Sequence, residues 1–512
     1  MYRYHFEMCL PCARVRPCPV LVPNPPGLFT GINAQAKSFR AREGRSPPLS
    51  GWKGHLIVLC MLSKSLLLLL TPSASLITLA WLLRRRRNKL RGSSVSTAVP
   101  DTPTLFSHIE RAGTHSVKHE LSSNPHGLQM WVADMELPCC PSVVRAISER
   151  AAHPNYGYTI QPAAIWDAVG SWLVARQGWR IPPACEEFIF SASVVTSFCN
   201  VLRALTSEGD AVLCMTPLYA PLQRAVTGCG RRLVEHRLAF GDRCAFGDTY
   251  SPKTYQMDAT TRLVERLDSE PSVRLLLLCN PHNPTGRVWR RAELAALARE
   301  CAKRQILVVS DEIWADWVLP SACQWPFEPF ANVAAAAGCQ YITLGAPTKS
   351  FSLAGLHASY LILPDARLRR KYLEYTEPAF LTYGSVFATA AMLAAYSDAA
   401  AAWLDAARTH VAANVHFLGS FLHHHVPQVT VEHLEATYCA WLNLGCLELD
   451  ADEMSARLKR AGLVLSPGRE FDSSGASDCF QRINLACSRP VLELAASRLR
   501  MLVEERLVEL GT

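Results

Sequence analysis

From residue 105 onward, apolar runs of strand length alternate with segments whose apolar residues recur at helical spacing. Strands are predicted at 187–193 (EFIFSAS), 210–214, 274–279, 306–310 and 342–346. Apolar residues between 194 and 205 recur every three or four positions, which predicts a helix directly after the first strand. Another helix is predicted at 291–303. This alternation is typical of an α/β fold with a mainly parallel sheet covered by helices.

The last part of the chain follows a different order. Long helical patterns near 401–424 and 489–507 flank two strand-like segments, TYCAWLNL at 437–444 and CFQRINLAC at 479–487. We expect these elements to form a smaller α+β domain, which residues 105–165 complete from the N-terminal side. The large domain would then span 166–400, and the C-terminal part of the small domain would span 401–512.

Residues 1–100 account for the excess of positive over negative charge in this chain. They contain 15 Lys and Arg and two acidic residues, although the whole chain has a formal net charge of only +8. The remaining residues are slightly acidic, with 37 Lys and Arg against 42 Asp and Glu. Because nucleic-acid-binding domains show clustered positive charge, we expect no nucleic-acid partner for that part.

An uncharged segment within this basic leader predicts a membrane anchor. As a helix, residues 66–83 would be about 27 Å long, close to the roughly 30 Å hydrocarbon core of a bilayer. Six Lys and Arg between 84 and 91 would keep this end, and the rest of the chain, on the cytosolic side. We therefore predict a hydrophobic anchor with its arginine cluster at 61–91 and a Ser-, Thr- and Pro-rich linker at 92–104.

Three other interpretations of the leader stay open. Translation could start at Met61, which would leave residues 1–60 as a basic leader that is not translated. The basic, acid-poor leader also fits an organellar transit segment, and its arginine run fits nuclear targeting.

The cysteines and a histidine run give no sign of a metal site. The 19 cysteines are scattered through a long chain, which favours free thiols over a disulfide framework. Cys9 and Cys12 form a CxxC without a second pair near them, and three histidines at 423–425 end a predicted helix. We assign no metal to either group.

Residues that could serve one cofactor follow three of the predicted strands. Asn283 lies in NPHNPTG at 280–286, Asp311 in SDEIW at 310–314, and Lys349 in APTKSFSLAGL at 346–356. A desolvated lysine amine is nucleophilic enough to hold an aldehyde as a Schiff base. Pyridoxal phosphate is an aldehyde that requires an acid and an amide beside the lysine. An acid such as Asp311 keeps its ring nitrogen protonated, and an amide such as Asn283 can donate to its phenolic oxygen.

The ends of neighbouring strands complete this set. Tyr219 also lies just past an apolar run, as expected if ligands bind outside the carboxyl ends of parallel strands. Ser193, Val194 and Val195 start the helix after the first strand, and the free N–H groups of a helix N-terminus suit a phosphate. A simple strand-to-helix turn would give the same pattern.

These motifs occur in order with WVADM at 131–135, NYGYT at 155–159, TPLY at 216–219 and RINLACSRP at 482–490. From about residue 105 to its end the chain thereby resembles the fold-type I aminotransferase superfamily (class I/II), and in it the MalY/PatB-like branch of cystathionine beta-lyases.

The resemblance implies a role for each matching residue. Lys349 would hold pyridoxal 5'-phosphate and act as the general base, Asp311 would hold the pyridinium nitrogen, and Asn283 the phenolic oxygen. The remaining roles are ring stacking by Tyr219, phosphate binding by Thr348, and binding of the neighbouring subunit's phosphate by Tyr158, which requires a homodimer. Arg482 would take the substrate carboxylate in a bidentate fork, and Ala133 belongs to the same substrate-binding set.

The resemblance also implies a carbon–sulfur beta-lyase acting on cystathionine or cysteine-type substrates. Many aminotransferases of the superfamily carry an arginine eight residues after the lysine, whereas the lyase branch commonly lacks it. This chain has His357 at that position, which favours the lyase branch. An aminotransferase, and a regulatory or binding protein that keeps the cofactor, stay open as alternatives.

Four residues depart from the branch. Trp314 stands where a histidine is usual, and an indole N–H can donate a hydrogen bond but cannot accept a proton. Ser352 replaces an asparagine, and Glu136 and Asn443 replace aspartates.

Overall fold

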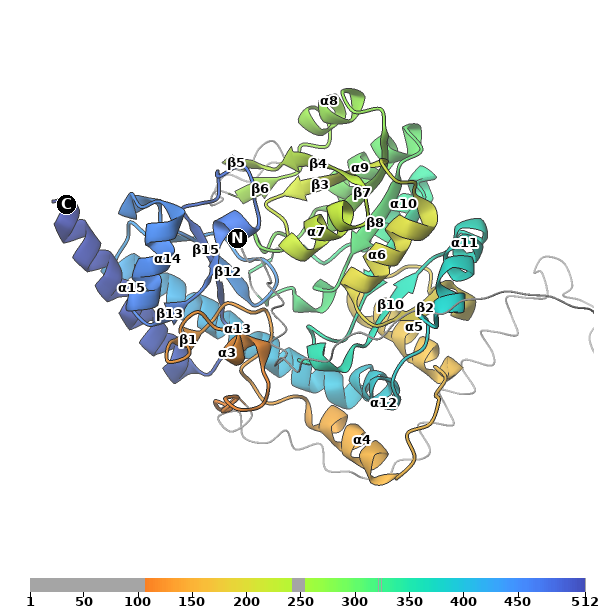
Figure 1. Ribbon diagram of the computed structural model, residues 1–512, viewed down its shortest axis with the longest axis horizontal. Helices are drawn as coiled ribbons and strands as arrows, with labels where there is room; N and C mark the ends of the chain where they lie inside the picture. Colours follow the sequence, from red (N-terminus) through yellow and green to blue (C-terminus); the bar gives the residue numbers. More distant parts are fainter. Residues whose placement is uncertain (1–105, 242–253, 321, 324, 512) are drawn as a thin grey trace, which may run out of the picture. The chain divides into compact units, whose positions relative to one another are not determined.

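The computed structural model describes residues 106–241, 254–320, 322, 323 and 325–511 (Figure 1). The anchor and arginine cluster predicted at 61–91, and the linker predicted at 92–104, lie outside these residues. Within the described ranges, no single helix is long and apolar enough to cross a membrane. The bent pair α12 (Val386–Ala395) and α13 (Asp398–His425) meets that criterion of length and composition only when both helices are counted together.

A seven-stranded sheet with the strand order β2-β10-β9-β8-β7-β3-β4 forms the centre of the large domain (Figure 1). Its strands are β2 (Phe188–Ser191), β10 (Ser359–Ile362), β9 (Tyr341–Gly345), β8 (Leu307–Asp311), β7 (Val273–Cys279), β3 (Ala211–Thr216) and β4 (Arg232–Arg237). The strands from β9 to β4 pair in parallel, whereas β10 runs antiparallel to both of its neighbours. The predicted mainly parallel sheet is therefore confirmed, with one reversed strand.

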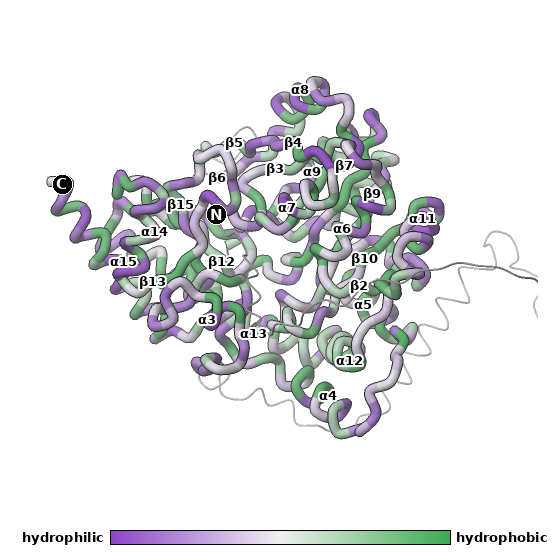
Figure 2. Tube along the Cα trace, viewed as in Figure 1, coloured by the Kyte–Doolittle hydropathy of each residue, from purple (hydrophilic) through white to green (hydrophobic). Residues whose placement is uncertain are grey.

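Alternating side chains of the central strands are buried against helices on opposite faces. On β7, Leu275 and Leu277 pack with α6 (Val194–Leu205) and α7 (Ala220–Gly228), whereas Leu276 and Leu278 pack with α9 (Arg291–Lys303) and α10 (Phe330–Ala337). Figure 2 shows the hydrophobic residues concentrated along these strands and hydrophilic residues along α8 (Arg262–Asp268) and α11 (Ala366–Thr376). Because both faces are covered, the inner strands are continuous apolar runs without alternation.

The smaller domain contains a four-stranded antiparallel sheet in the order β11-β12-β15-β14. Its elements are β11 (Thr430–Val431), β12 (Cys439–Asn443), β15 (Phe480–Asn484), β14 (Ser466–Pro467), α14 (Ala451–Arg460) and α15 (Arg489–Leu510). From the N-terminal side, β1 (Leu128–Gln129) pairs with β13 (Leu463–Val464), whereas α4 (Pro141–Ala152) packs against α12. The predicted domain limits at 165/166 and 400/401 stay predictions.

The two domains meet closely at Gly286, the last residue of NPHNPTG. Its carbonyl accepts hydrogen bonds from the N–H groups of Ala436 at 2.9 Å and Glu435 at 3.1 Å. Its φ is +70°, and a Cβ at this position would lie 2.1 Å from Leu434 Cδ1 and 2.9 Å from Ala436 O. Only glycine fits both the left-handed backbone and the close approach of the second chain segment.

The substitution Gly286→Ala should therefore destabilise the fold more than a glycine substitution at an open left-handed position. Gly338→Ala is the matched control, because Gly338 has a φ of +65° and no atom within 4 Å of the added Cβ. Both variants lose about 1–2 kcal/mol to backbone strain. Gly286→Ala should lose a further 1–3 kcal/mol, roughly, to overpacking, as measured by urea unfolding. Equal losses in the two variants would contradict the steric argument.

Candidate active site

The carboxyl ends of the parallel strands bring the predicted cofactor residues to one edge of the sheet. Asp311 ends β8, Lys349 and Asn283 follow β9 and β7, and Tyr219 follows β3 as the N-cap residue of α7. The register aligns Cys279 with Asp311, and Asp311 with Leu344, so these loops start side by side. The sheet thus gathers at one edge four residues that are up to 130 positions apart in the chain.

The side chain of Lys349 lies between the Trp314 ring, a backbone carbonyl and several charged groups. Its Nζ donates to the carbonyl oxygen of Ala133 at 2.6 Å and lies 5.7 Å from the centre of the Trp314 ring. Trp317 Nε1 donates to the backbone carbonyl of Lys349 at 2.8 Å and fixes the position of the residue. Burial lowers the pKa of Lys349, although the negative charges of Asp134 and Asp311 oppose this effect. The amine is therefore closer to its reactive neutral form than an exposed lysine would be.

Asp311 is a buried acid at the end of β8. Only 4% of the residue is exposed, and burial raises the pKa of its carboxyl to about 7. A hydrogen bond from the N–H of Ile313 to Oδ1, 3.2 Å long, and the nearby charge of Lys349 act in the opposite direction. A cationic ring N–H beside this carboxyl would stabilise its ionised form, as the predicted role requires.

Asn283 and Arg482 contact each other directly, although they come from different domains. Arg482 Nη1 donates to Asn283 Oδ1 at 3.0 Å, so the amide oxygen is occupied and the amide nitrogen has no acceptor among the described residues. Arg482 Nη2 donates to Trp131 O at 2.9 Å, and the guanidinium lies 4.8 Å from the centre of the Phe471 ring. Its Nε is buried without a partner in the part of the chain that the structure describes, so a donor remains for an anion.

The start of α6 offers donors for a phosphate. Ser193 caps the helix by accepting from the N–H of Thr196 at 3.0 Å, whereas the N–H groups of Val194 and Val195 have no acceptor in the described ranges. The pairing of Ser191 with Ser359 places this turn beside β10, which pairs in turn with β9. The hydroxyl of Thr348 likewise has no hydrogen-bond partner among the described residues.

Taken together, these groups fit pyridoxal 5'-phosphate. The set contains an amine for its aldehyde, a buried acid for its ring nitrogen, an amide N–H for its phenolic oxygen, and open N–H groups for its phosphate. Tyr219 borders the same edge, and burial raises the pKa of its hydroxyl. The individual roles of these residues stay predictions.

Two residues to which the sequence motifs drew attention, Tyr158 and His357, lie at the surface. Tyr158 is fully exposed at 107% of its reference area and contacts none of the other predicted site residues in the described part of the chain. Its role toward a neighbouring subunit therefore stays a prediction. His357 is exposed and has a φ of +52°, at the end of the turn after Lys349.

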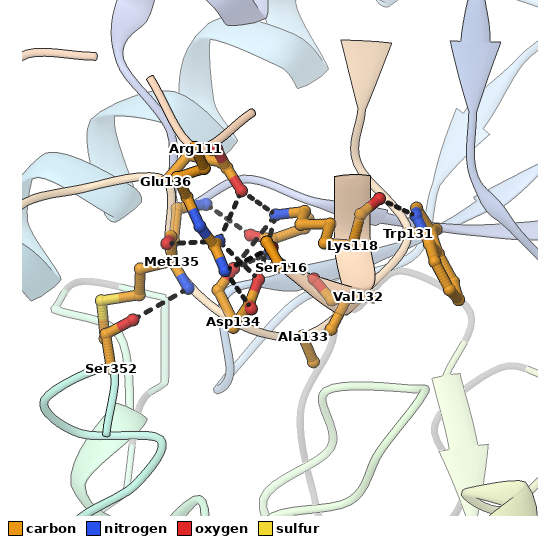
Figure 3. A network of polar contacts seen from close by, with 12 residues as sticks. Arg111, Ser116, Lys118, Trp131, Val132, Ala133, Asp134, Met135, Glu136 and Ser352 are labelled. Atoms are coloured by element: carbon orange, nitrogen blue, oxygen red, sulfur yellow. Dashed lines mark hydrogen bonds and ion pairs between the residues drawn. The ribbon is translucent and has the colours of Figure 1, made fainter. Parts of the chain in front are cut away.

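A charged network behind Ala133 was missed by sequence reasoning. Figure 3 shows Arg111 and Lys118 converging on the segment that contains Asp134 and Glu136. Lys118 Nζ lies 2.8 Å from Glu136 Oε1, and its side chain is fully buried. The motif WVADM indicated that this segment matters, but no spacing rule pairs it with residues about 20 positions earlier.

Trp314 and Ser352, which depart from the residues usual in the lyase branch, each make a defined contact near Lys349. Trp314 is buried and packs edge-on against Tyr438, with ring centres 4.7 Å apart. Ser352 has a φ of +58°, and its hydroxyl accepts from the N–H of Met135 at 3.3 Å. Asparagine adopts this left-handed conformation more readily than serine, so the hydrogen bond offsets part of the backbone cost.

Within the described ranges, no group of three or more His, Cys, Asp or Glu side chains could hold a metal ion. The described cysteines are free thiols.

Comparison with known proteins places this arrangement in a family. Cystathionine beta-lyase PatB of Bacillus subtilis is 34% identical over 400 residues, which cover 76% of this chain and 97% of that protein. Protein MalY of Escherichia coli is 27% identical, with 75% of this chain and 95% of that protein covered. The crystal structure of cystalysin from Treponema denticola, which contains pyridoxal 5'-phosphate, superposes with a TM-score of 0.71 at 25% identity, covering 78% of this chain and 98% of that one.

The family model for aminotransferase class I and II matches residues 135–499, a segment that contains all the cofactor residues of the sheet edge. By that match and by its similarity to PatB, the chain belongs to the class I and II aminotransferase family, in its branch of cystathionine beta-lyases.

Proposed function

We propose that this protein is a pyridoxal-phosphate-dependent carbon–sulfur beta-lyase. It would cleave the bond between the β carbon and sulfur of cystathionine or a cysteine-type amino acid, and release a thiol, pyruvate and ammonia. The observation that carries the proposal is the gathering of Lys349, Asp311, Asn283 and Arg482 around one buried edge of the sheet. Two similar proteins support the proposal: PatB is named a cystathionine beta-lyase, and the crystal structure of cystalysin contains pyridoxal 5'-phosphate.

Each residue contributes a distinct step. When bound, the cofactor supplies an electron sink that stabilises negative charge on the substrate α carbon. Lys349 takes the α proton, because burial favours its neutral amine over the ammonium form. Arg482 binds the substrate carboxylate with its remaining donors, and Asp311 and Asn283 orient the ring from β8 and β7.

Phosphate binding falls to a separate group of residues. The N–H groups of Val194 and Val195, with the hydroxyl of Thr348 and the cap residue Ser193, form the phosphate end of the site. Tyr219 stacks on the ring face. The Ala133 segment closes the substrate side opposite them, where its carbonyl meets Lys349.

An aminotransferase is the second candidate, because the family model that matches residues 135–499 is named for aminotransferases of class I and II. With the cofactor bound, an aminotransferase would pass the substrate amino group to a 2-oxo acid, whereas a lyase would expel the β thiolate and yield pyruvate and ammonia. A regulatory protein that keeps the cofactor is a third candidate, and the replacement of a proton-accepting histidine by Trp314 is the feature that favours it.

The full chain incubated with L-cystathionine should release pyruvate and thiol in equal amounts. Lys349→Ala should lower this rate by about a thousandfold or more, because it removes both the covalent attachment and the base. Lys371→Ala, which changes an exposed lysine on α11, should leave the rate unchanged. The assay measures pyruvate, thiol and amino transfer to a 2-oxo acid in parallel.

Each outcome of this assay points to one candidate. Amino transfer without pyruvate would replace the lyase by the aminotransferase, and no product by either route would favour the regulatory protein. Equal rates for Lys349→Ala and the wild type would refute the proposed site altogether.

We also propose that the protein forms a homodimer through an apolar surface around Tyr158. Exposed fractions there are 107% for Tyr158, 72% for Ile160, 69% for Phe380 and 52% for Tyr383. The two loops that carry these residues are adjacent, because a Cβ at Gly384 would lie 2.7 Å from Gln161 Nε2. A surface of this kind on a family member supports a second copy of the chain as its partner.

The double substitution Ile160→Asp and Phe380→Asp should convert the dimer to a monomer in sedimentation velocity, because it places two charges in an apolar interface. Val508→Asp is the control, since Val508 is 77% exposed near the end of α15. A wild-type chain that sediments as a monomer, or a double variant that still dimerises, would disprove this interface.

For the leader we propose a single membrane anchor at residues 66–83, with the enzyme on the cytosolic side. The full chain should then stay with membranes during an alkaline carbonate wash and dissolve only in detergent. Leu76→Arg combined with Ile77→Arg should release it, because charges at the centre of a span cost about 2.5–3.5 kcal/mol each. Release of the wild-type chain by carbonate alone would exclude an anchor.

A further inference from the structure

The backbone carbonyl of Ala133 accepts two hydrogen bonds inside the site. Lys349 Nζ donates to it at 2.6 Å, and the hydroxyl of Tyr438 donates to it at 3.0 Å. A carbonyl oxygen has two lone pairs, so these two donors occupy both. None of the roles assigned so far explains why this one carbonyl faces the reactive amine.

The segment around Ala133 is fixed on both sides by β15. Asn484 Nδ2 donates to the carbonyls of Val132 at 2.8 Å and Asp134 at 2.5 Å, and its backbone N–H donates to Met130 O at 2.9 Å. The residues before and after Ala133 are thereby held to one side chain. These bonds hold the carbonyls on either side, whereas the Ala133 carbonyl itself is bonded only to Lys349 and Tyr438 among the described residues.

A second set of contacts holds the same segment from residues 111–118, which we call the N-terminal arm. Arg111 Nη2 lies 2.8 Å from Asp134 Oδ2, and Lys118 Nζ lies 3.3 Å from Asp134 Oδ1 and 3.2 Å from the Asp134 carbonyl (Figure 3). Burial by itself would raise the pKa of Asp134, but the hydrogen bond from Arg111 and the charge of Lys118 lower it. Asp134 therefore stays ionised beside the amine.

We propose that the Ala133 carbonyl is the acceptor that holds the amine of Lys349 whenever that amine is free, and that Arg111 and Lys118 are the positioning residues that keep it there. An ammonium group has three donors and no acceptor, so in a buried site it needs such a carbonyl. The neutral amine, which donates one N–H to Ala133, directs its lone pair elsewhere and remains able to take a proton. The hydroxyl of Tyr438 donates its hydrogen bond to the Ala133 carbonyl, so it does not donate to the lone pair of the Lys349 amine.

This inference deepens the proposed function and rests on it for one point, that the free amine acts as the base. The groups that face the amine are Cys439 and Tyr438 from β12 and the turn before it, Asp134, Arg482 from β15, and Asp311 from β8. Of these, only Asp134 is contacted by Arg111 and Lys118, and the Ala133 carbonyl immediately precedes it in the chain. Loss of the arm therefore tests these two contacts and leaves the others in place.

The test uses Arg111→Met and Lys118→Met in the full, cofactor-free chain, with Arg457→Met as control. Arg457 pairs with Glu453 and Glu509 on α14 and α15, outside the site. The measurement is the pH dependence of the rate at which each chain captures added pyridoxal phosphate, which follows the free-amine fraction of Lys349. Circular dichroism and urea unfolding verify that each variant is folded.

Loss of the acceptor destabilises the ammonium form, so the capture midpoint should move to lower pH by about one unit in both arm variants. It should not move in Arg457→Met. With L-cystathionine, kcat should fall on the order of tenfold while KM stays within about twofold, because the amine is misplaced and the carboxylate site is intact.

The opposite direction would overturn the inference. If the Ala133 segment stayed in place, removal of a nearby positive charge would favour the ammonium and move the midpoint to higher pH. A shift in that direction, or an unchanged midpoint, excludes the positioning role. Capture does not depend on turnover, so a wild-type chain that captures the cofactor but makes no product would contradict the lyase alone.

Discussion

The hydrogen bond between Arg482 and Asn283 is the contact on which the site depends, because it joins the two domains at their functional residues. Arg482 comes from the small-domain strand β15, and Asn283 from the loop after β7. Both are buried, so a docked guanidinium that lost this acceptor would keep a buried donor without its partner, at a cost of about 1–3 kcal/mol. The nearby Gly286 permits the close backbone approach that makes the contact geometrically possible.

One strand then positions both sides of the substrate space. Arg482 and Asn484 lie two positions apart on β15, so their side chains point to the same face of the small sheet. Arg482 reaches Asn283, and Asn484 holds the carbonyls on both sides of Ala133. Arg482, for which we propose carboxylate binding, and the segment around Ala133 are therefore held by a single element.

Burial acts on the two central ionisable groups in opposite directions. It raises the pKa of Asp311 to about 7 and lowers the pKa of Lys349, and both shifts favour the neutral form because a charge is costly in a low-dielectric interior. Both shifts agree with the roles proposed for the two groups, a carboxyl that a cationic ring nitrogen would ionise and an amine that is neutral more often than an exposed lysine. The same enclosed edge of the sheet produces both effects.

The sequence alone determined the α/β class, the five strands predicted from apolar runs, and helices such as α9. Apolar runs and the 3.6-residue spacing of apolar residues in helices are local properties of the chain, so they can be recognised without the tertiary structure. It also predicted Lys349, Asp311 and Asn283 from short motifs and Arg482 from the family resemblance, and their roles stay predictions. Only the tertiary structure decided that Ala133 faces Lys349 across 216 positions, and that Arg111 and Lys118 hold its segment. Such contacts depend on how distant strands dock, and no local spacing of residues encodes that geometry.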